Sequence, residues 1–207
     1  INSVKDFEGK TYAGWGAPSE EAVIKAVMNE AGADFSKLNI VGSDGSGIAG
    51  LSDEVGKNKV NLGWEFYGWA IIKALQDGYD LNYMPLADLD SRLDYYTPVI
   101  ITNNKMIKKN SDTIQKFMEA TKKGYEYAID HPSKAAEILH DDALTDTDLK
   151  FLKESQKYLS SQYAKDADSW GVMKDSVWDN YTDFMYETGL IDHKIDAKDQ
   201  YTNEFVK

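Results

Sequence analysis

The sequence KTYAGWGAPSEEAVIKAVMNEA, from Lys10 to Ala31, combines a strand pattern, a glycine-containing loop and an amphipathic helix pattern. Residues 10–14 form the strand candidate, and residues 20–31 form the helix candidate, in which apolar side chains recur every 3.6 residues. This order predicts a strand followed by a helix that packs on one face of a sheet. The apolar residues expected on the buried face of this helix are Val23, Ile24, Val27, Met28 and Ala31.

The same alternation of strands and helices continues to about residue 90. A βαβαβαβ order predicts an α/β fold with a largely parallel sheet and right-handed crossovers. The further strands are expected at residues 38–41, 60–62 and 82–86, and the further helices at residues 48–57 and 67–76.

Beyond Asp94 the pattern becomes helical after one β-branched stretch, Tyr96 to Thr102. A single strand cannot make a sheet, so this stretch is expected to join the sheet of the α/β segment that ends near residue 90, or strands outside the chain. The last helix is expected at residues 174–188. The predicted helix starts between these points are a Ser111 cap, Pro132 as a first helical residue, and a capping box of Thr145 with Asp148.

Composition excludes several classes of protein. The chain has 207 residues, 42% of them hydrophobic and 12% aromatic, which excludes a disordered chain. A net charge of -12 with one arginine, Arg92, argues against a nucleic-acid binder and against an anionic substrate held by a guanidinium group. Cysteine is absent, which excludes disulfides and zinc–thiolate sites. The three histidines, His131, His140 and His193, lack the spacing of a metal site or a catalytic triad.

The sequence contains neither a run that predicts a membrane span nor the pattern that predicts a signal peptide. No apolar run reaches the ~18 residues that span a bilayer. The chain opens at Ile1 without Met and a basic segment, so we expect that its start is a cut made by processing or by the choice of the expressed fragment.

The loop between the first strand and the first helix is a candidate ligand site, because ligands bind at the carboxyl ends of parallel strands. Glu20 and Glu21 occupy the first helical turn, where they balance the positive end of the helix dipole behind a Ser19 cap. This arrangement argues against a phosphate or sulfonate ligand. A neutral or weakly basic ligand that stacks on Trp15 fits better.

A second candidate is Gly63-Trp64-Glu65-Phe66-Tyr67-Gly68-Trp69, which places four aromatic rings and one carboxylate after the third strand. Trp and Tyr combine an apolar face with a polar edge, which is typical of a recognition surface. The alternative is a strand that turns into a helix whose rings pack in the core. If residues 60–62 are a strand, this segment lies on the same rim as Trp15, which favours a binding cleft. The Glu65 carboxylate then needs a hydrogen-bond donor, which a ligand could supply.

A third candidate is Asp94-Tyr95-Tyr96-Thr97-Pro98, where the chain leaves the α/β segment that ends near residue 90. Tyrosines beside a hinge commonly line a cleft, and tyrosine is also a good strand residue. Both interpretations of Tyr95 and Tyr96 remain open at this point.

Together these residues resemble the solute-binding proteins of bacterial ABC importers, in the branch shared with the yeast thiamine-pyrimidine synthases. Within this branch the chain is most similar to the binding proteins for pyrimidine precursors of thiamine salvage. The resemblance covers nearly the whole chain, and the order of its motifs is more specific than any single one. The motifs are residues 14–21, 63–65, 95–103, 124–129 with Pro132, 158–160, 170–171 and 201–205.

The resemblance implies a periplasmic-binding-protein type II-like fold with a three-layer αβα lobe. Residues 5–89 would be the second lobe, residues 94–207 would be the return strand and helical segment of the first lobe, and the family's N-terminal portion would be missing. The ligand would be a thiamine-related pyrimidine or a similar flat heterocycle in an inter-lobe cleft, with Glu65 accepting from its N–H edge. The ligand-binding residues would be Trp15, Gly16, Ser19, Trp64, Glu65, Tyr67, Tyr95 and Tyr96.

The resemblance also implies partners and a location. The protein would work outside the cytoplasm, in the periplasm or as a cell-surface lipoprotein, with an ABC permease in the membrane and without a cofactor or a catalytic residue. The yeast-type synthases carry a cysteine-rich motif where this chain has residues 94–98, so its lack of cysteine argues for binding without catalysis. Surface left uncovered by an incomplete lobe predicts self-association.

Alternatives from other classes stay open. Within the same superfamily they are a flavin receptor or a sulfonate receptor. Outside it they are an enzyme of pyrimidine synthesis, which would turn over in the presence of iron, and a structural or adhesive domain in which the aromatic rings are core.

Overall fold

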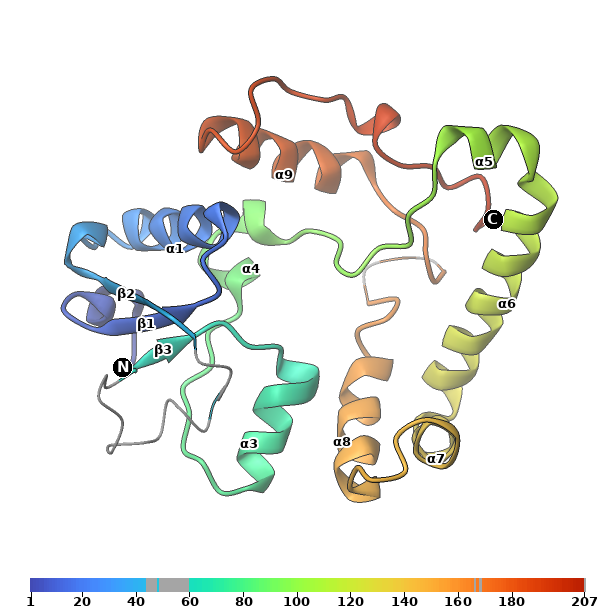
Figure 1. The fold of residues 1–207 in the computed structure, drawn as a ribbon, viewed down its shortest axis with the longest axis horizontal. Coiled ribbons are helices and arrows are strands. Elements are labelled where there is room, and N and C mark those ends of the chain that lie inside the picture. Colours follow the sequence, from blue (N-terminus) through green and yellow to red (C-terminus); the bar gives the residue numbers. More distant parts are fainter. Residues whose placement is uncertain (44–47, 49–59, 166, 168, 207) are drawn as a thin grey trace. The chain divides into compact units, whose positions relative to one another are not determined.

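A computed structural model describes residues 1–43, 48, 60–165, 167 and 169–206 and divides the chain into two compact units (Figure 1). The first unit contains Ile1–Tyr95 and Asn180–Lys194, and the second contains Tyr96–Asp179 and Ile195–Lys207. Helix α9, Asp175–Glu187, therefore begins in the second unit and ends in the first. The assignment of residues 5–89 and 94–207 to two lobes of a binding protein stays a prediction.

The first unit contains a three-stranded parallel sheet in the order β2-β1-β3. The central strand β1 is Thr11–Gly14, β2 is Asn39–Gly42 and β3 is Leu62–Gly63. Tyr12 of β1 is in register with Ile40 of β2 and with Leu62 of β3. The first two strands confirm the predicted segments, and the third lies at the end of its predicted segment. The chain is thus a mixed α/β protein with a small parallel sheet and mostly helical structure elsewhere.

Two predicted strands are wrong. Residues 82–85 form no strand, and Leu86–Leu89 is the short helix α4 with Pro85 as its N-cap. Residues 96–103 also form neither strand nor helix. A proline has no N–H for a sheet ladder, and Pro85 and Pro98 lie inside these two stretches. The β-branched run around Val99 indicated strand propensity, but propensity alone does not supply a neighbouring strand.

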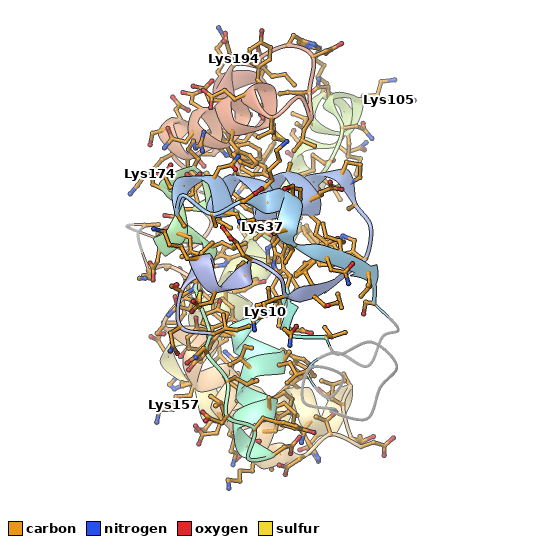
Figure 2. All side chains as sticks on the ribbon, turned by 90° about the vertical axis from the view of Figure 1, so that its left-hand side faces the viewer. Lys10, Lys37, Lys105, Lys157, Lys174 and Lys194 are labelled. Atoms are coloured by element: carbon orange, nitrogen blue, oxygen red, sulfur yellow. The ribbon has the colours of Figure 1, made fainter. Side chains whose placement is uncertain are left out.

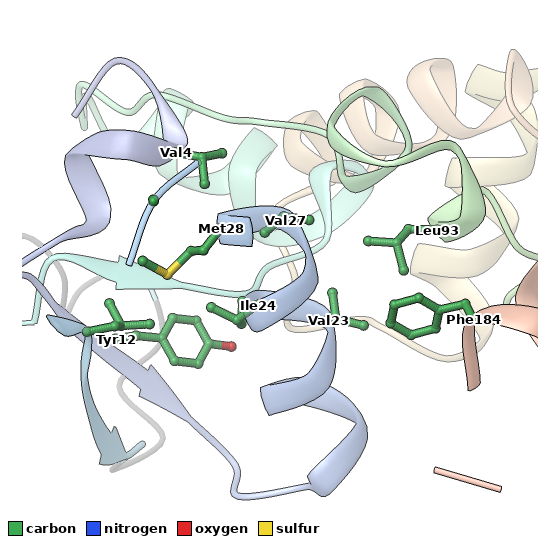
Figure 3. Packing of buried hydrophobic residues seen from close by; sticks show 10 residues of the cluster. Val4, Tyr12, Val23, Ile24, Val27, Met28, Leu93 and Phe184 are labelled. Carbon is green, nitrogen blue, oxygen red and sulfur yellow. The ribbon is translucent and has the colours of Figure 1, made fainter. Parts of the chain in front are cut away.

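Helix α1, Pro18–Glu30, supplies four of the ten buried residues of the main core cluster of the first unit (Figure 3). Pro18 stands at its first position, where a missing N–H costs nothing, and Gly32 follows it with φ +68°. The predicted buried face is confirmed for Val23, Ile24, Val27 and Met28, while Ala31 follows the helix and is partly buried. The residues packed with this face include Val4, Tyr12, Ala33, Leu38, Leu93 and Phe184.

The remaining elements of the first unit are short. Residues 67–76 are helical as predicted, but Tyr67–Ile71 is a wide π-type turn, η3, and the α-helix α3 is Ile72–Gln76. The helix predicted at residues 48–57 lies outside the described residues, except for Ile48. The 3-10 turns of this unit are η1 at Val4–Phe7, η2 at Phe35–Lys37 and η4 at Ser91–Leu93.

The second unit is helical in the part of the chain that the structure describes. Helices α7, Pro132–Asp142, and α8, Leu149–Ser160, pack together, with Ala136, Phe151 and Leu152 buried. Lys153 Nζ of α8 lies 2.7 Å from Glu137 Oε1 of α7. The last predicted helix is confirmed as α9. The bounds of the others are α5 Asn104–Lys109, α6 Ser111–Asp130 and the 3-10 turn η5 Ala197–Asp199.

Of the three predicted helix starts in this unit, one is confirmed and two have a different N-cap residue. Pro132 opens α7 as expected. Ser111 is the first residue of α6 and not its cap, because α5 ends directly before it and Asn110 joins the two helices. At α8 the cap is Asp148, whose carboxylate accepts from the N–H groups of Lys150 and Phe151 at 3.2 and 3.3 Å. An aspartate at this position satisfies two orphan amides, so Thr145 is not needed as a cap.

Helix α6 places its apolar side chains on one face, but none of its residues is buried. Phe117 is 57% exposed, and in the extended segment before α5 the side chain of Ile101 is 85% exposed. The second unit therefore presents apolar side chains to solvent from α6 and from the segment before α5.

Candidate ligand-binding site

The loop from β1 to α1 is built around one buried carboxylate, that of Glu20, which is 3% exposed. The Tyr12 hydroxyl donates to Glu20 Oε1 at 2.5 Å. The backbone N–H groups of Trp15 and Gly16 donate to Glu20 Oε2 at 3.0 and 3.1 Å. Three donors thus replace the water that this carboxylate loses on burial.

Gly14 makes this arrangement sterically feasible. A Cβ atom at Gly14 would lie 2.5 Å from Glu20 Oε1 and 2.8 Å from Tyr12 Cε1. No side chain fits in that space without moving the carboxylate or the ring. Gly16 contributes the positive φ, +80°, with which the loop turns toward the helix.

The predicted role of the helix start is wrong in part. Ala17 is the N-cap of α1 and makes no side-chain hydrogen bond, while Ser19 is exposed and caps nothing. Glu21 is exposed, as a residue that balances the helix dipole would be, but Glu20 points back into the loop. The physical reason is that Tyr12 and two loop amides offer Glu20 stronger partners than solvent does.

The structure brings the two predicted aromatic loops together. Trp15 follows β1 and Trp64 follows β3, and because these strands are parallel neighbours both residues lie at the same edge of the sheet. Their ring centroids are 5.3 Å apart with planes inclined by 57°. Trp15 is 59% exposed while Trp64 packs partly on the core, so this pair offers an aromatic face to solvent. The part that these rings play in binding stays a prediction.

Glu65 follows Trp64 and differs from Glu20 in its surroundings. Its side chain is half-buried, and burial raises the pKa of its carboxyl above the ordinary value. Among the described residues it has no hydrogen-bond partner and no ion-pair partner. The pKa of the Tyr12 phenol is raised mainly by burial and by the bond to Glu20, and the charge of Glu65 adds to this. The charge of Glu65 therefore bears on the Tyr12 phenol as well.

The segment after Glu65 exposes further rings. Phe66 is 67% exposed, and Trp69 in the π-type turn is also exposed. Tyr67 instead packs edge-on against Tyr83, with ring centroids 5.0 Å apart. Phe66 and Trp69 were not among the predicted contact residues. Phe66 lies between Gly63 and Gly68, and Trp69 directly follows Gly68. These neighbouring glycines were the signal in the sequence that could have indicated both residues.

Tyr95 and Tyr96 fall in different units. The Tyr95 ring stacks on Tyr181 of α9 at 4.2 Å with planes inclined by 24°, and burial raises the pKa of its phenol. Tyr96 belongs to the second unit, where its hydroxyl accepts from the Lys174 N–H at 3.0 Å. Both tyrosines thus have structural neighbours of their own. Their role as ligand contacts stays a prediction.

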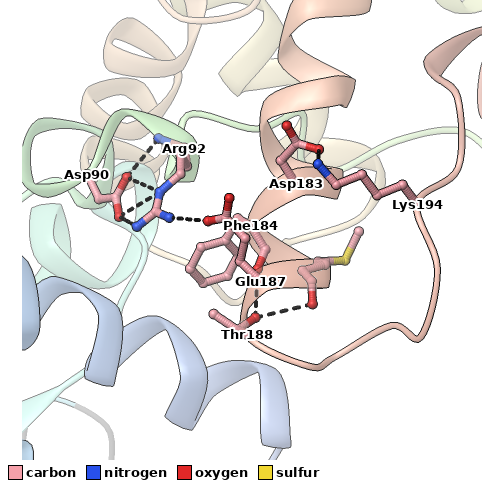
Figure 4. Close-up of polar contacts among 8 residues, drawn as sticks. Asp90, Arg92, Asp183, Phe184, Glu187, Thr188 and Lys194 are labelled. Carbon is pink, nitrogen blue, oxygen red and sulfur yellow. Dashed lines mark hydrogen bonds and ion pairs between the residues drawn. The ribbon is translucent and has the colours of Figure 1, made fainter.

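A shallow depression of about 480 Å³ lies elsewhere on the first unit, lined by Glu30 and residues 87–92. It contains Arg92, whose guanidinium group binds Asp90 Oδ2 at 2.6 Å and Glu187 Oε2 at 2.8 Å (Figure 4). This pairing lowers the pKa of the Asp90 carboxyl. Arg92 also lies over the ring of Phe184, 5.5 Å from its centroid. The guanidinium group of Arg92 thus links α9 to η4. The depression has no aromatic ring in its lining on which a heterocycle could stack.

Positive charges in the described structure are dispersed. The lysines labelled in Figure 2 project outward from separate elements, such as Lys105 in α5 and Lys157 in α8. Lys37 is paired with Glu8 at 2.7 Å.

Within the described ranges no group of three or more His, Asp or Glu side chains could hold a metal ion. Over the same residues, no helix has both the length and the apolarity to cross a bilayer.

Comparisons with known proteins give this α/β chain a family. The family model described as NMT1/THI5 like matches residues 1–135, which is more than half of the chain. The chain therefore belongs to the NMT1/THI5-like family, which confirms the family inferred from its motifs. A relative named formylaminopyrimidine-binding protein, from Halalkalibacterium halodurans, is 24% identical over 185 residues. The match covers 82% of this chain and 54% of that protein, so the chain spans about half the length of this relative.

Proposed function

We propose that this protein is a solute-binding component of an ABC importer that binds a thiamine-related pyrimidine, or a similar flat heterocycle, outside the cytoplasm. The observation that carries the proposal is the exposed Trp15–Trp64 pair beside the Glu65 carboxylate, which lacks a partner among the described residues. The family membership and the name of the bacterial relative support the same ligand class.

The chemistry of an aminopyrimidine matches this arrangement. Its flat ring can stack on an indole, and its exocyclic amine and ring nitrogens present hydrogen-bond donors at one edge. A carboxylate that is already half desolvated gains more from such donors than a fully hydrated one does, because less water must be removed. Glu65 would then accept from the ligand, and Trp15 would cover its face.

An anionic ligand fits the same edge poorly. A sulfonate would lie near the carboxylates of Glu20 and Glu65, and the one arginine, Arg92, is paired with two carboxylates elsewhere. The protein is proposed to act by binding alone, without a cofactor. Residues 5–89 and 94–207 are proposed to belong to two lobes of a type II-like binding protein. Its permease partner follows from the same proposal.

Calorimetry with the full-length protein tests the ligand class. Formylaminopyrimidine and related aminopyrimidines should bind, and an alkyl sulfonate should not. Replacing Glu65 with Gln should weaken aminopyrimidine binding by about 1–3 kcal/mol, or roughly 5- to 150-fold, because the amide lacks the negative charge. The exposed neighbour Glu21→Gln serves as the matched control. Binding of the sulfonate without heat from any aminopyrimidine would refute the assignment, and an unchanged affinity of Glu65→Gln would remove Glu65 from the site.

Self-association is a second proposal, supported by the apolar surface of the second unit. Val99, Ile100 and Ile101 are exposed in an extended segment, and Phe117 is exposed on α6. Exposed apolar patches of this kind favour contact between molecules. Analytical ultracentrifugation of the chain should show oligomers that Ile101→Lys dissociates. A monomer at all concentrations would refute this proposal and leave the ligand proposal untouched.

A further inference from the structure

The β1–α1 loop already holds an anion, and that anion is part of the chain. The consecutive N–H groups of Trp15 and Gly16 converge on one oxygen, Glu20 Oε2. Consecutive amides in a turn with one residue at positive φ form a concave anion site, and here Gly16 supplies φ +80°. The start of the 13-residue helix α1 adds a positive partial charge at the same place. These are the groups that bind phosphate in many α/β proteins.

The carboxylate that fills this site is firmly held. Glu20 is buried, receives a third hydrogen bond from the Tyr12 hydroxyl, and occupies space that any Cβ at Gly14 would take. An external phosphate would have to expel Glu20 or approach it. Two like charges a few ångströms apart repel each other strongly where little water separates them. The charges that act on the Tyr12 phenol come from Glu20 and Glu65, both of them carboxylates.

We propose that Glu20 is a specificity-determining residue, which makes this edge of the sheet reject phosphorylated heterocycles by occupying the amides that would otherwise bind the phosphate. The identity of the heterocycle rests on the proposed function, whereas the occupation of the loop amides by Glu20 is observed in the structure. The site thus takes the alcohol or amide form of its heterocycle, and a phosphate monoester of the same heterocycle is excluded.

A purely structural role for Glu20 makes a different prediction. In that case its loss would destabilise the loop and weaken all ligands equally. Under the proposal, its loss changes the ratio of affinities for an ester and its parent alcohol. This ratio and the response of the loop amides to phosphate are the decisive measurements.

The first test uses inorganic phosphate and needs no pyrimidine. Full-length wild type, Glu20→Ala, Glu20→Gln and the control Glu21→Gln are titrated with phosphate while the amide resonances of Trp15 and Gly16 are followed by NMR. Phosphate should shift both resonances in Glu20→Ala, to a smaller extent in Glu20→Gln, and not in wild type or Glu21→Gln. Equal shifts in wild type, or no shift in a folded Glu20 variant, would overturn the proposal. Failure of both Glu20 variants to fold, with Glu21→Gln folded, would make Glu20 structural and would also overturn it.

The second test measures specificity. Calorimetry compares a hydroxymethyl aminopyrimidine with its phosphate monoester on the same proteins. Wild type and Glu21→Gln should prefer the alcohol by at least about tenfold, and Glu20→Gln should reduce that preference by about tenfold or more, which is 1.4 kcal/mol. An unchanged preference would overturn the proposal. If wild type binds neither compound, the proposed function fails, and the phosphate titration alone decides the role of Glu20.

Discussion

Two carboxylates follow neighbouring strands of the small sheet, Glu20 after β1 and Glu65 after β3, and the fold surrounds them differently. Glu20 is buried and accepts hydrogen bonds from a phenol and two backbone amides. Glu65 is half-buried and has no hydrogen-bond or ion-pair partner among the described residues, and burial raises the pKa of its carboxyl. A buried carboxylate that accepts several hydrogen bonds holds a structure together, whereas a half-buried carboxylate without a protein donor can still accept a hydrogen bond from outside the fold. The contrast separates the residue that shapes the loop from the residue that we propose as a ligand contact.

The largest effect on the free energy of unfolding is expected from Gly14→Ala, which disturbs the site of the Glu20 carboxylate. The added methyl group would lie 2.5 Å from Glu20 Oε1. Overpacking of this kind costs about 1–3 kcal/mol, and the displaced carboxylate would lose hydrogen bonds as well. Urea denaturation should therefore show a loss near the upper end of this range.

Gly42→Ala is the matched control for that substitution. Gly42 ends β2 as Gly14 ends β1, but a Cβ at Gly42 would meet nothing within 4 Å. Its effect on the free energy of unfolding should stay within about 0.5 kcal/mol. Equal losses for the two glycines would show that the contacts of Glu20 do not define the loop.

The next largest effect is expected from Tyr12→Phe, which removes one of the three donors to Glu20. The loss should be about 1.5 kcal/mol, the lower end of the range for a hydrogen bond to a charged group, because two donors to Glu20 remain. Tyr79→Phe is the control, because Tyr79 is partly buried and has no hydroxyl bond recorded within the described residues. A loss for Tyr79→Phe as large as that for Tyr12→Phe would contradict this account.

The pH dependence of the Tyr12 contribution has a defined sign. Burial and the bond to Glu20 raise the pKa of the Tyr12 phenol above its ordinary value of 10.0. The native state then keeps a proton that the unfolded chain releases, so stability falls as the pH rises above about 10. Tyr12→Phe should show a shallower alkaline decline than the parent, measured by thermal unfolding between pH 8 and 11. An identical decline in both proteins would mean that Tyr12 is not held protonated by the fold.

Much of this edge could be predicted from the sequence. The 3.6-residue period of Val23, Val27 and Met28 gave the buried face of α1, and the rule for parallel strands placed Trp15 near Trp64. Both inferences depend on regular geometry, which repeats from one protein to another. The predicted strand at residues 82–86 failed because Pro85 ends strand pairing and begins α4.

The role of Glu20 could not be read from local pattern. An acidic residue in a first helical turn looks the same whether it faces water or turns inward. Its direction depends on Tyr12, eight residues earlier, and on the missing side chain of Gly14. The order Tyr12, Gly14, Glu20 was present in the sequence, but only the packing of strand against helix gives it meaning.

The smallest effect is expected from Glu65→Gln in the absence of ligand. Because burial raises the pKa of the Glu65 carboxyl, the native state binds its proton more tightly than the unfolded chain does, and stability declines as the pH rises above about 4.5. The amide removes this decline, so the variant should be more stable than the parent at pH 7, by up to about 0.5 kcal/mol, and equal to it below about pH 4. Denaturation at both pH values, with exposed Glu21→Gln as the control, measures the difference. A Glu65→Gln protein less stable than its parent at pH 7 would mean that this carboxylate has a partner within the fold, and the contrast with Glu20 would disappear.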